Sequence, residues 1–220
     1  MEKELLNEIK KSKAEIVVFD IDGTLKDLCA EHSSAVKLSI AEFANCKKIR
    51  KKLILSIDKL AMSTVKTGLL PTNHIMQNIL IFIYSIVLNV QFRKFKEVYF
   101  AYYKKELCLF DGAFELIEKL NKSYEVYFAT INKQNYNLEA CGIGQDKIIY
   151  VTDKLKKTTY SKFIKCKGVD KAKVIIVGDN VFDDMLSAKI IKTKHILVNN
   201  YDSKIKKIIC RVLNGRYLKE

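Results

Sequence analysis

The chain contains few of the residues that favour turns and irregular structure, since only 8 of its 220 residues are Gly and 1 is Pro. This scarcity excludes collagen-like, Pro-rich and linker-dominated chains. The six cysteines form no C-x-x-C pair, and the three histidines offer no zinc-ligand spacing. We therefore expect reduced cysteines that pack as small hydrophobic residues, and histidines with structural or surface roles.

The first 13 residues are charged and contain no apolar run, so we expect no signal peptide and a cytoplasmic protein. Hydrophobic residues make up 49% of the chain and charged residues 29%, which is typical of a globular protein. Lys and Arg number 39 against 25 Asp and Glu, giving a net charge of +14. That excess favours anionic ligands, but it does not choose among phosphate esters, nucleic acid and lipid.

Short apolar runs alternate with helical patterns in the second half of the chain. Residues 15–19 are mostly β-branched or aromatic, as in a buried central strand, and similar runs occupy residues 125–129, 148–151, 174–177 and 195–198. Helical patterns occupy residues 113–120, 136–141, 159–166 and 183–191. This alternation predicts an α/β fold, with a Rossmann-like parallel sheet covered by helices on both faces.

Residues 27–108 interrupt this alternation, since they contain helical patterns at 33–44, 48–63 and 92–107 and no convincing strand. The sequence therefore predicts an all-helical domain over 27–108, inserted into a core domain made of residues 1–26 and 109–220. Within the insertion, the apolar run 79–88 is half the ~20 residues that a membrane-spanning helix needs. We interpret it as a buried helix of the insertion, or as a dimer contact.

Two carboxylates follow the first predicted strand, in the sequence D-I-D-G-T at residues 20–24. Ligands of open parallel sheets bind beyond the carboxyl ends of the strands, and residues two apart on a strand point to the same side. Asp20 and Asp22 would repel each other there unless a cation lies between them or one pKa is raised. A hard, oxygen-seeking ion such as Mg²⁺ meets this need and could also bind a phosphate group.

Polar residues also follow two later predicted strands. Thr130 ends the strand at 125–129, and Gly178 and Asp179, with a further acidic pair at 183–184, follow the strand at 174–177. A lysine-rich segment lies between them and precedes a predicted helix. With these pieces in this order, the chain resembles the haloacid-dehalogenase-like (HAD) hydrolase superfamily. D-I-D-G-T resembles the family's first motif, Thr130 its second, and Asp179 with the acidic pair its fourth.

The resemblance implies a phosphatase that works through an aspartyl-phosphate, with Asp20 as nucleophile and Asp22 as general acid and then base. It further implies that Gly23, Thr130 and a lysine hold the phosphoryl group. Lys157 fits the lysine position best and Lys156 is the alternative, because the prolines that mark this motif in some relatives are absent. The implied Mg²⁺ ligands are Asp20, Asp22 (through its main-chain carbonyl), Asp179 and Asp184, with Asp183 as the alternative to Asp184.

The helical insertion resembles the family's C1-type cap, which implies a small phosphorylated substrate. A phosphomutase with the same nucleophile is one alternative function. A basic nucleic-acid-binding module is another, since residues 147–173 carry nine Lys against two Asp. No aromatic stacking motif accompanies these lysines, so we expect neither a nucleic-acid nor a membrane partner. The oligomeric state stays open.

Overall fold

The computed structural model describes residues 2–43, 45–66, 74–103, 108–130, 143–151, 156–200 and 217–219. The chain divides into two compact units. The core unit comprises Met1–Asp27 and Leu109–Glu220, and the helical unit comprises Leu28–Cys108. The predicted helix at 136–141 lies outside the described residues.

The core unit is built on one parallel sheet of six strands in the order β3-β2-β1-β4-β5-β6. The strands are β1 (Ile16–Asp20), β2 (Glu125–Thr130), β3 (Ile148–Tyr150), β4 (Val174–Gly178), β5 (Lys194–Asn199) and β6 (Tyr217–Lys219). The sheet confirms the predicted α/β class, and it extends by one short edge strand, β6, that the sequence did not predict.

Strand β1 lies in the middle of the sheet, which explains why all five of its residues are buried. It pairs with β2 on one side, where Asp20 is opposite Ala129, and with β4 on the other, where Phe19 is opposite Val177. Because ladder partners cover both edges and helices cover both faces, a continuous apolar run is required here. The nucleophile candidate Asp20 therefore lies at the end of a strand that is buried throughout.

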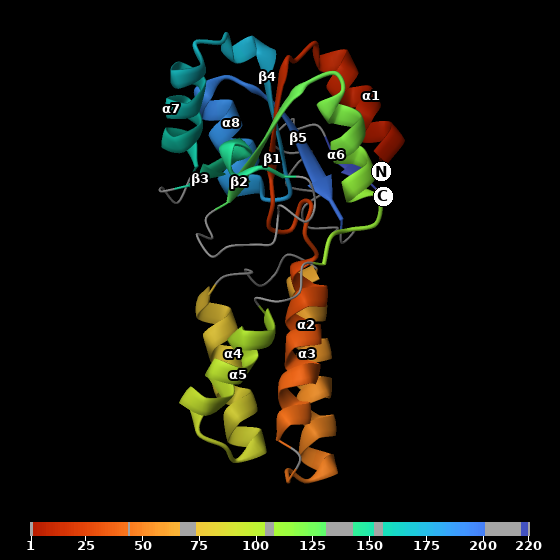
Figure 1. The fold of residues 1–220 in the computed structure, drawn as a ribbon, viewed down its shortest axis with the longest axis vertical. Helices are drawn as coiled ribbons and strands as arrows, with labels where there is room; N and C mark the ends of the chain where they lie inside the picture. The colour runs from red at the N-terminus through yellow and green to blue at the C-terminus, as the bar shows by residue number, and fades with distance from the viewer. Residues whose placement is uncertain are drawn as a thin grey trace. The chain divides into compact units, whose positions relative to one another are not determined.

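Helices cover the sheet on both faces, with α1 and α6 packed together on one side and α7 and α8 on the other (Figure 1). These helices are α1 (Glu2–Ser12), α6 (Ala113–Asn121), α7 (Lys157–Lys167) and α8 (Leu186–Ile191). Ile16 and Val18 of β1 form one apolar cluster with Tyr160 and Ile164 of α7. Short helical turns precede three strands or helices: η2 (Gln145–Lys147), η3 (Lys171–Lys173) and the π-helical turn η4 (Val181–Met185).

The helical unit contains four helices and no strand among its described residues. They are α2 (Leu28–Glu42), α3 (Lys48–Lys66), α4 (His74–Leu88) and α5 (Phe92–Tyr103). Helix α2 packs on α3 and α5, and α4 packs on the same two helices, as in a four-helix arrangement. Val36, Ile54, Tyr84 and Phe95 are fully buried in its interior.

The apolar run 79–88 lies in helix α4, which is buried on one face only and not on all sides as we expect from the sequence. One face is buried, including Leu80, Ile81 and Tyr84, but the opposite face is exposed. Phe82 on that face is 52% exposed and Ile86 61%. Among the described residues, no helix combines the length and apolar character that crossing a membrane demands.

A buried polar network joins the helices of the helical unit around Asp58. Its carboxylate accepts hydrogen bonds from Ser33 (2.7 Å) and Tyr84 (3.0 Å), and Nε2 of His32 lies 3.1 Å from Oδ1. Nδ1 of His32 lies 2.7 Å from the hydroxyl of Tyr99. Burial raises the pKa of Asp58, but the contacts with His32 and Ser33 outweigh it and hold this pKa below its ordinary value. His32 thus has the structural role expected of it.

We expect Asp58→Ala to lower the free energy of unfolding by about 3 kcal/mol, because it leaves His32, Ser33 and Tyr84 without their buried acceptor. Urea unfolding measures this loss, and Lys59→Ala at the exposed neighbouring position serves as control. Since the pKa of Asp58 is lower in the folded than in the unfolded chain, its contribution is present near neutral pH and is lost as the pH falls below about 4. An unchanged unfolding midpoint at pH 7 would contradict the importance of the network.

Candidate active site

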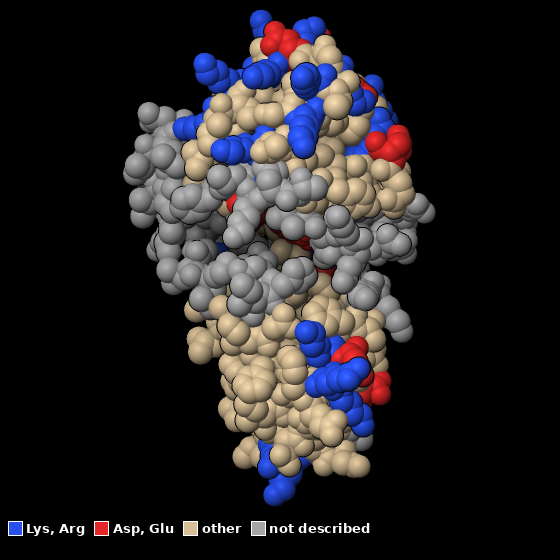
Figure 2. Space-filling view, turned by 90° about the vertical axis from the view of Figure 1, so that its left-hand side faces the viewer, with Lys and Arg blue, Asp and Glu red and all other residues tan. Residues whose placement is uncertain are grey.

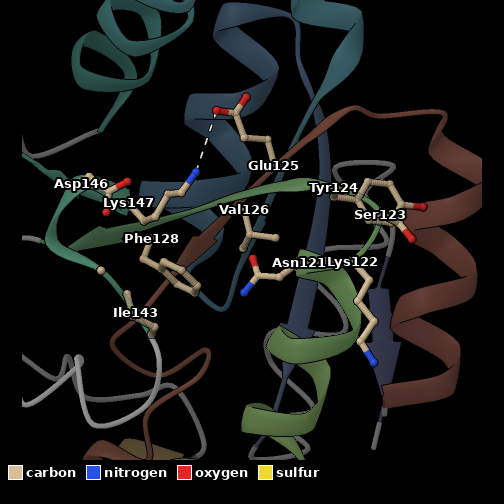
Figure 3. A pocket seen from close by; sticks show the side chains of 11 residues that line it. Asn121, Lys122, Ser123, Tyr124, Glu125, Val126, Phe128, Ile143, Asp146 and Lys147 are labelled. Carbon is tan, nitrogen blue, oxygen red and sulfur yellow. Dashed lines mark ion pairs between the residues drawn. The ribbon is translucent and has the colours of Figure 1, made fainter.

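A cavity of about 650 Å³ lies around the first half of β2, lined by the end of α6, by β2 and by residues 143–147 (Figure 3). Lys147 and Glu125 form an ion pair at 4.0 Å on its wall. None of the predicted catalytic side chains lines this cavity. The candidate site instead lies where β1, β2 and β4 end.

Asp20 is followed by a tight loop that returns the chain beside the end of β1. The carbonyl of Ile21 accepts hydrogen bonds from the main-chain N–H groups of Thr24, Leu25 and Lys26. Gly23 has a φ of +89°, and a Cβ there would lie 2.8 Å from the carboxylate of Asp179, so only glycine fits. The conformation required at Gly23 thus explains the glycine of the D-I-D-G-T sequence.

Asn200, which follows β5, holds this loop from another part of the sheet. Its side-chain amide donates hydrogen bonds to the carbonyls of Gly23 (3.0 Å) and Thr24 (2.8 Å). Asn200 is buried and was not singled out from the sequence, because no spacing relative to the first motif marks it. It fixes the loop that carries Asp22.

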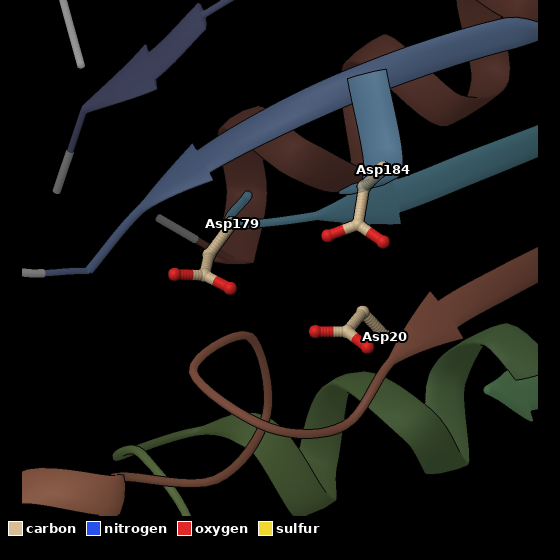
Figure 4. A group of neighbouring side chains, drawn as sticks. All are labelled: Asp20, Asp179 and Asp184. Carbon is tan, nitrogen blue, oxygen red and sulfur yellow. The ribbon is translucent and has the colours of Figure 1, made fainter. Parts of the chain in front are cut away.

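Three carboxylates converge at the ends of β1 and β4: Asp20, Asp179 and Asp184 (Figure 4). One oxygen of each lies within 4.8 Å of the others. Asp20 and Asp184 are buried, and Asp179 is half-buried. A Cβ at Gly178 would lie 2.4 Å from the carboxylate of Asp184, so this glycine lets the acidic side chain fold back beside the strand end.

Lys156 lies between two of these carboxylates. Its ammonium group donates to Asp20 Oδ1 at 2.6 Å and to Asp184 Oδ1 at 2.7 Å, and the side chain is 3% exposed. Lys157, which fits the lysine position best in the sequence, is exposed at the first turn of α7. Lys156 precedes the helix with a φ of +52°, and this turn directs its side chain inward. The structure therefore places Lys156, the alternative, beside Asp20, and leaves Lys157 at the surface.

The charges of this group act on one another. Burial and, after it, the nearby Asp184 raise the pKa of Asp20, although Lys156 opposes them. Burial also raises the pKa of Asp184. Burial lowers the pKa of Lys156, but Asp184 and Asp20 more than offset this and raise it above its ordinary value. The group thus holds three carboxylates and one ammonium, which contacts two of them, and the excess of negative charge suits a further cation.

Asp184 rather than Asp183 belongs to the group. The Asp184 carboxylate also accepts hydrogen bonds from Tyr160 (3.3 Å) and from the main-chain N–H of Asn180 (3.2 Å). Asp183 instead pairs with the side chain of Asn180, whose Oδ1 accepts from the main-chain N–H of Asp183 at 3.0 Å. The turn η4 therefore directs these two adjacent acidic side chains to different partners.

The side chain of Asp22 does not belong to the group of three carboxylates and has other partners. Its Oδ2 accepts a hydrogen bond from Thr130 at 3.1 Å, and its Oδ1 lies 3.8 Å from the ammonium of Lys26. Lys26 is only 1% exposed, and sequence reasoning missed it because a lone lysine after a turn carries no distinguishing signal. Asp22 contributes no carboxylate to the acidic group, so a role in metal binding would rest on its main-chain carbonyl.

The family model described as haloacid dehalogenase-like hydrolase matches residues 17–198. The chain therefore belongs to the haloacid dehalogenase-like hydrolases. No curated protein matches the sequence significantly.

Several solved structures share the fold. The presumed HAD-hydrolase YfnB from Bacillus subtilis, solved with bound magnesium, has a TM-score of 0.61 at 18% identity, covering 91% of this chain and 99% of its own. A presumed phosphatase from Clostridium difficile has a TM-score of 0.60 at 20% identity, covering 94% and 95%. A dehalogenase has a TM-score of 0.53 at 16% identity, covering 90% and 96%. At such identities, the similarity shows a common fold.

Proposed function

We propose that the protein is a Mg²⁺-dependent phosphomonoester hydrolase that acts on a small phosphorylated metabolite through an aspartyl-phosphate. The observation that carries this proposal is the position of Asp20. Its carboxylate ends the central strand, contacts the ammonium of Lys156 and faces two further carboxylates, with Asp22 two residues away. This arrangement combines a nucleophile, a phosphate-binding cation and a second acid in one place.

In the first step, a carboxylate oxygen of Asp20 attacks phosphorus and the bond from phosphorus to the leaving oxygen breaks. Asp22 gives its proton to that oxygen, so the alcohol leaves neutral. Lys156 and the hydroxyl of Thr130 hold phosphoryl oxygens, whose charge is spread widely in the loose transition state. Before substrate binds, Thr130 donates its one hydroxyl proton to Asp22. In the complex Thr130 would donate to the phosphoryl group instead, and Lys26 would still hold the Asp22 carboxyl group in place.

In the second step, water attacks the phosphorus of the aspartyl-phosphate and Asp20 leaves as a carboxylate. Asp22, now ionised, accepts a proton from that water and is ready for the next cycle. Inorganic phosphate is then released.

The residues present fit a magnesium ion. Asp20, Asp179 and Asp184 would hold it, with the main-chain carbonyl of Asp22, since hard oxygen ligands and an excess of negative charge are what Mg²⁺ selects. When bound, the ion supplies positive charge that offsets the developing charge on the phosphoryl group. We also propose that the helical unit acts as a C1-type cap, which would restrict the substrate to small phosphomonoesters.

Asp22 favours phosphoryl chemistry over dehalogenation. A leaving halide needs no proton, so a second acid would be idle in a dehalogenase. A phosphomutase would use the same residues but would pass the phosphoryl group to a sugar hydroxyl in place of water. A nucleic-acid-binding role, the other alternative, has only the excess of basic residues in its favour.

The test is hydrolysis of an aryl phosphate and a panel of sugar phosphates, nucleotides and phosphoglycolate, with Mg²⁺ and with chelator. We expect phosphate release with Mg²⁺ and its loss with chelator. We also expect Mg²⁺ to raise the melting temperature, by an amount equivalent to about 2.7 kcal/mol at a hundred times its dissociation constant. Transfer between sugar positions without phosphate release would instead identify a mutase, and tight RNA or DNA binding without turnover would identify a binding module.

The close approach of Gly178 to Asp184 gives a prediction about metal binding. We expect Gly178→Ala to displace the Asp184 carboxylate, lower stability by about 2 kcal/mol and weaken the Mg²⁺-dependent rise in melting temperature. Gly168→Asn, at the left-handed end of α7 with nothing within 4 Å of a Cβ, is the control. Full Mg²⁺ response in Gly178→Ala would argue against Asp184 as a ligand.

A further inference from the structure

A tyrosine of α7 contacts the acidic group of the candidate active site. Tyr160 lies in the first turn of α7 and is 1% exposed, and its main-chain N–H donates to the carbonyl of Lys156 at 2.9 Å. Its hydroxyl group donates a hydrogen bond to Oδ1 of Asp184 at 3.3 Å. This hydroxyl takes no part in the proposed reaction steps, so its contact with a candidate metal ligand points to another role.

The packing of α7 fixes the position of this hydroxyl. Tyr160 and Ile164, one turn apart, lie in the apolar cluster that also contains Val18 of β1. Lys162 and Lys165 are exposed on the opposite side of the helix. Figure 2 views the core unit from the α7 side and shows basic side chains spread over this surface. Turning the helix would bury ammonium groups and expose the ring, so the Tyr160 ring is held in one place.

The Asp184 carboxylate receives hydrogen bonds from three parts of the chain. The ammonium of Lys156 donates to Oδ1 at 2.7 Å, and the hydroxyl of Tyr160 donates to the same oxygen. The main-chain N–H of Asn180 donates to Oδ2 at 3.2 Å. A carboxylate has about four lone-pair positions, so these three donors leave about one for an ion. Donors on both oxygens also fix the orientation of the carboxylate.

Lys156 and Tyr160 differ in how firmly they hold Asp184. The ammonium of Lys156 also contacts Asp20, at 2.6 Å, and in the proposed reaction it binds phosphoryl oxygens as well. Its hold on Asp184 is therefore shared with other partners. A tyrosine hydroxyl carries a single proton, which Tyr160 donates to Asp184, and its ring has no freedom to follow the substrate. Tyr160 can thus hold the Asp184 carboxylate with or without substrate.

We propose that Tyr160 is a positioning residue for magnesium binding, which orients the Asp184 carboxylate through its hydroxyl group. This inference rests on the Mg²⁺ site of the proposed function. Removing a hydrogen-bond partner of a metal ligand typically lowers metal affinity about 10–100-fold. Because the hydroxyl is one of three donors to Asp184, we expect an effect at the lower end of that range.

The experiment measures Mg²⁺ affinity by isothermal titration calorimetry of the whole chain without substrate. Tyr160→Phe removes the hydroxyl, keeps the buried ring and should raise the Kd for Mg²⁺ by about tenfold. Tyr127→Phe is the matched control, because the Tyr127 ring belongs to the same apolar cluster but its hydroxyl contacts Glu125, outside the acidic group. It should bind Mg²⁺ as the wild type does.

A second measurement needs no metal. In urea unfolding with chelator present, Tyr160→Phe should lower the unfolding midpoint of the wild-type chain, because it removes a hydrogen bond to a buried carboxylate. The same substitution should not lower the midpoint of an Asp184→Ala variant, in which the hydroxyl has already lost its acceptor. Additive losses in the two backgrounds would show that Tyr160 acts through something other than Asp184.

Wild-type Mg²⁺ affinity in Tyr160→Phe would overturn the inference and leave the metal site intact. Equal losses of affinity in both phenylalanine variants would also overturn it, since they would assign the effect to packing of the apolar cluster. A wild-type chain that binds no Mg²⁺ would refute the metal site and, with it, this role of Tyr160. Tenfold weaker binding in Tyr160→Phe, without phosphate release by the wild type, would support the inference while refuting the phosphatase.

Discussion

Asp20→Asn should lower phosphate release by about 10⁴-fold or more, the largest effect expected of any single substitution in the chain. The amide that replaces the carboxylate is a poor nucleophile, so no covalent intermediate can form. Steady-state release of phosphate from the best panel substrate measures the loss. Mass spectrometry of the wild type after rapid acid quench should find a phosphoryl group on the peptide that contains residue 20.

Asp146→Asn is a matched control for this change, since Asp146 is an exposed carboxylate beside the cavity at β2 and outside the acidic group. It should keep wild-type activity. Removing one of several mutually repelling carboxylates should not destabilise the chain. We therefore expect the circular dichroism spectrum of Asp20→Asn to match that of the wild type. Substantial turnover in a folded Asp20→Asn variant would exclude Asp20 as nucleophile.

Lys156→Met should lower kcat/KM by about 10²–10³-fold, the scale of losing one preorganised charge at a transition state. Methionine matches the length and burial of the lysine but removes its charge. Lys157→Met, one residue away and exposed, should stay within about twofold of wild type, since surface charges contribute little. This pair of variants compares the two lysines directly.

The stability of Lys156→Met, relative to the wild type, should depend on pH. Without Lys156, Asp20 and Asp184 repel with no ammonium between them, so their pKa values should rise further. A carboxylate whose folded pKa is raised destabilises the protein at neutral pH and ceases to do so as the pH falls and it becomes protonated. Lys156→Met should therefore lose stability relative to wild type at pH 7 and regain part of it at pH 5. Equal losses of activity in Lys156→Met and Lys157→Met would refute Lys156 as the phosphate-binding lysine.

The sequence allowed the sheet and most of the site to be predicted because both rest on local patterns. Strands β1 and β4 are buried on both faces, so their residues are apolar up to the last one, Asp20 or Gly178. Polar residues at and just after these strand ends must lie at one edge of the sheet. Glycines at 23 and 178 mark close approaches of backbone to carboxylate. The positions of the strand ends follow from the strands themselves, whereas the approach of Gly23 to Asp179 joins two distant parts of the chain.

The sequence left undecided those features that depend on turn conformation or on packing between elements. Whether Lys156 or Lys157 turns inward depends on the backbone conformation just before α7, and adjacent lysines offer no clue to it. The burial of Lys26 depends on the loop closed by Asn200, nearly 180 residues later. Helix α4 has no charged residue, so its composition alone suggested burial on every side, although one face lacks a partner within the described chain.

The central place of β1 has a consequence for how the protein is made. Its hydrogen-bonding partners begin at Glu125 and Val174, although β1 itself is complete at Asp20. A ribosome that adds about 5–20 residues per second would leave this apolar strand without neighbours for about 5 seconds or more. Meanwhile the intervening helices, whose contacts are local, can fold first. Newly synthesised chains are therefore most exposed to aggregation through β1, and chaperone binding during translation should concentrate there.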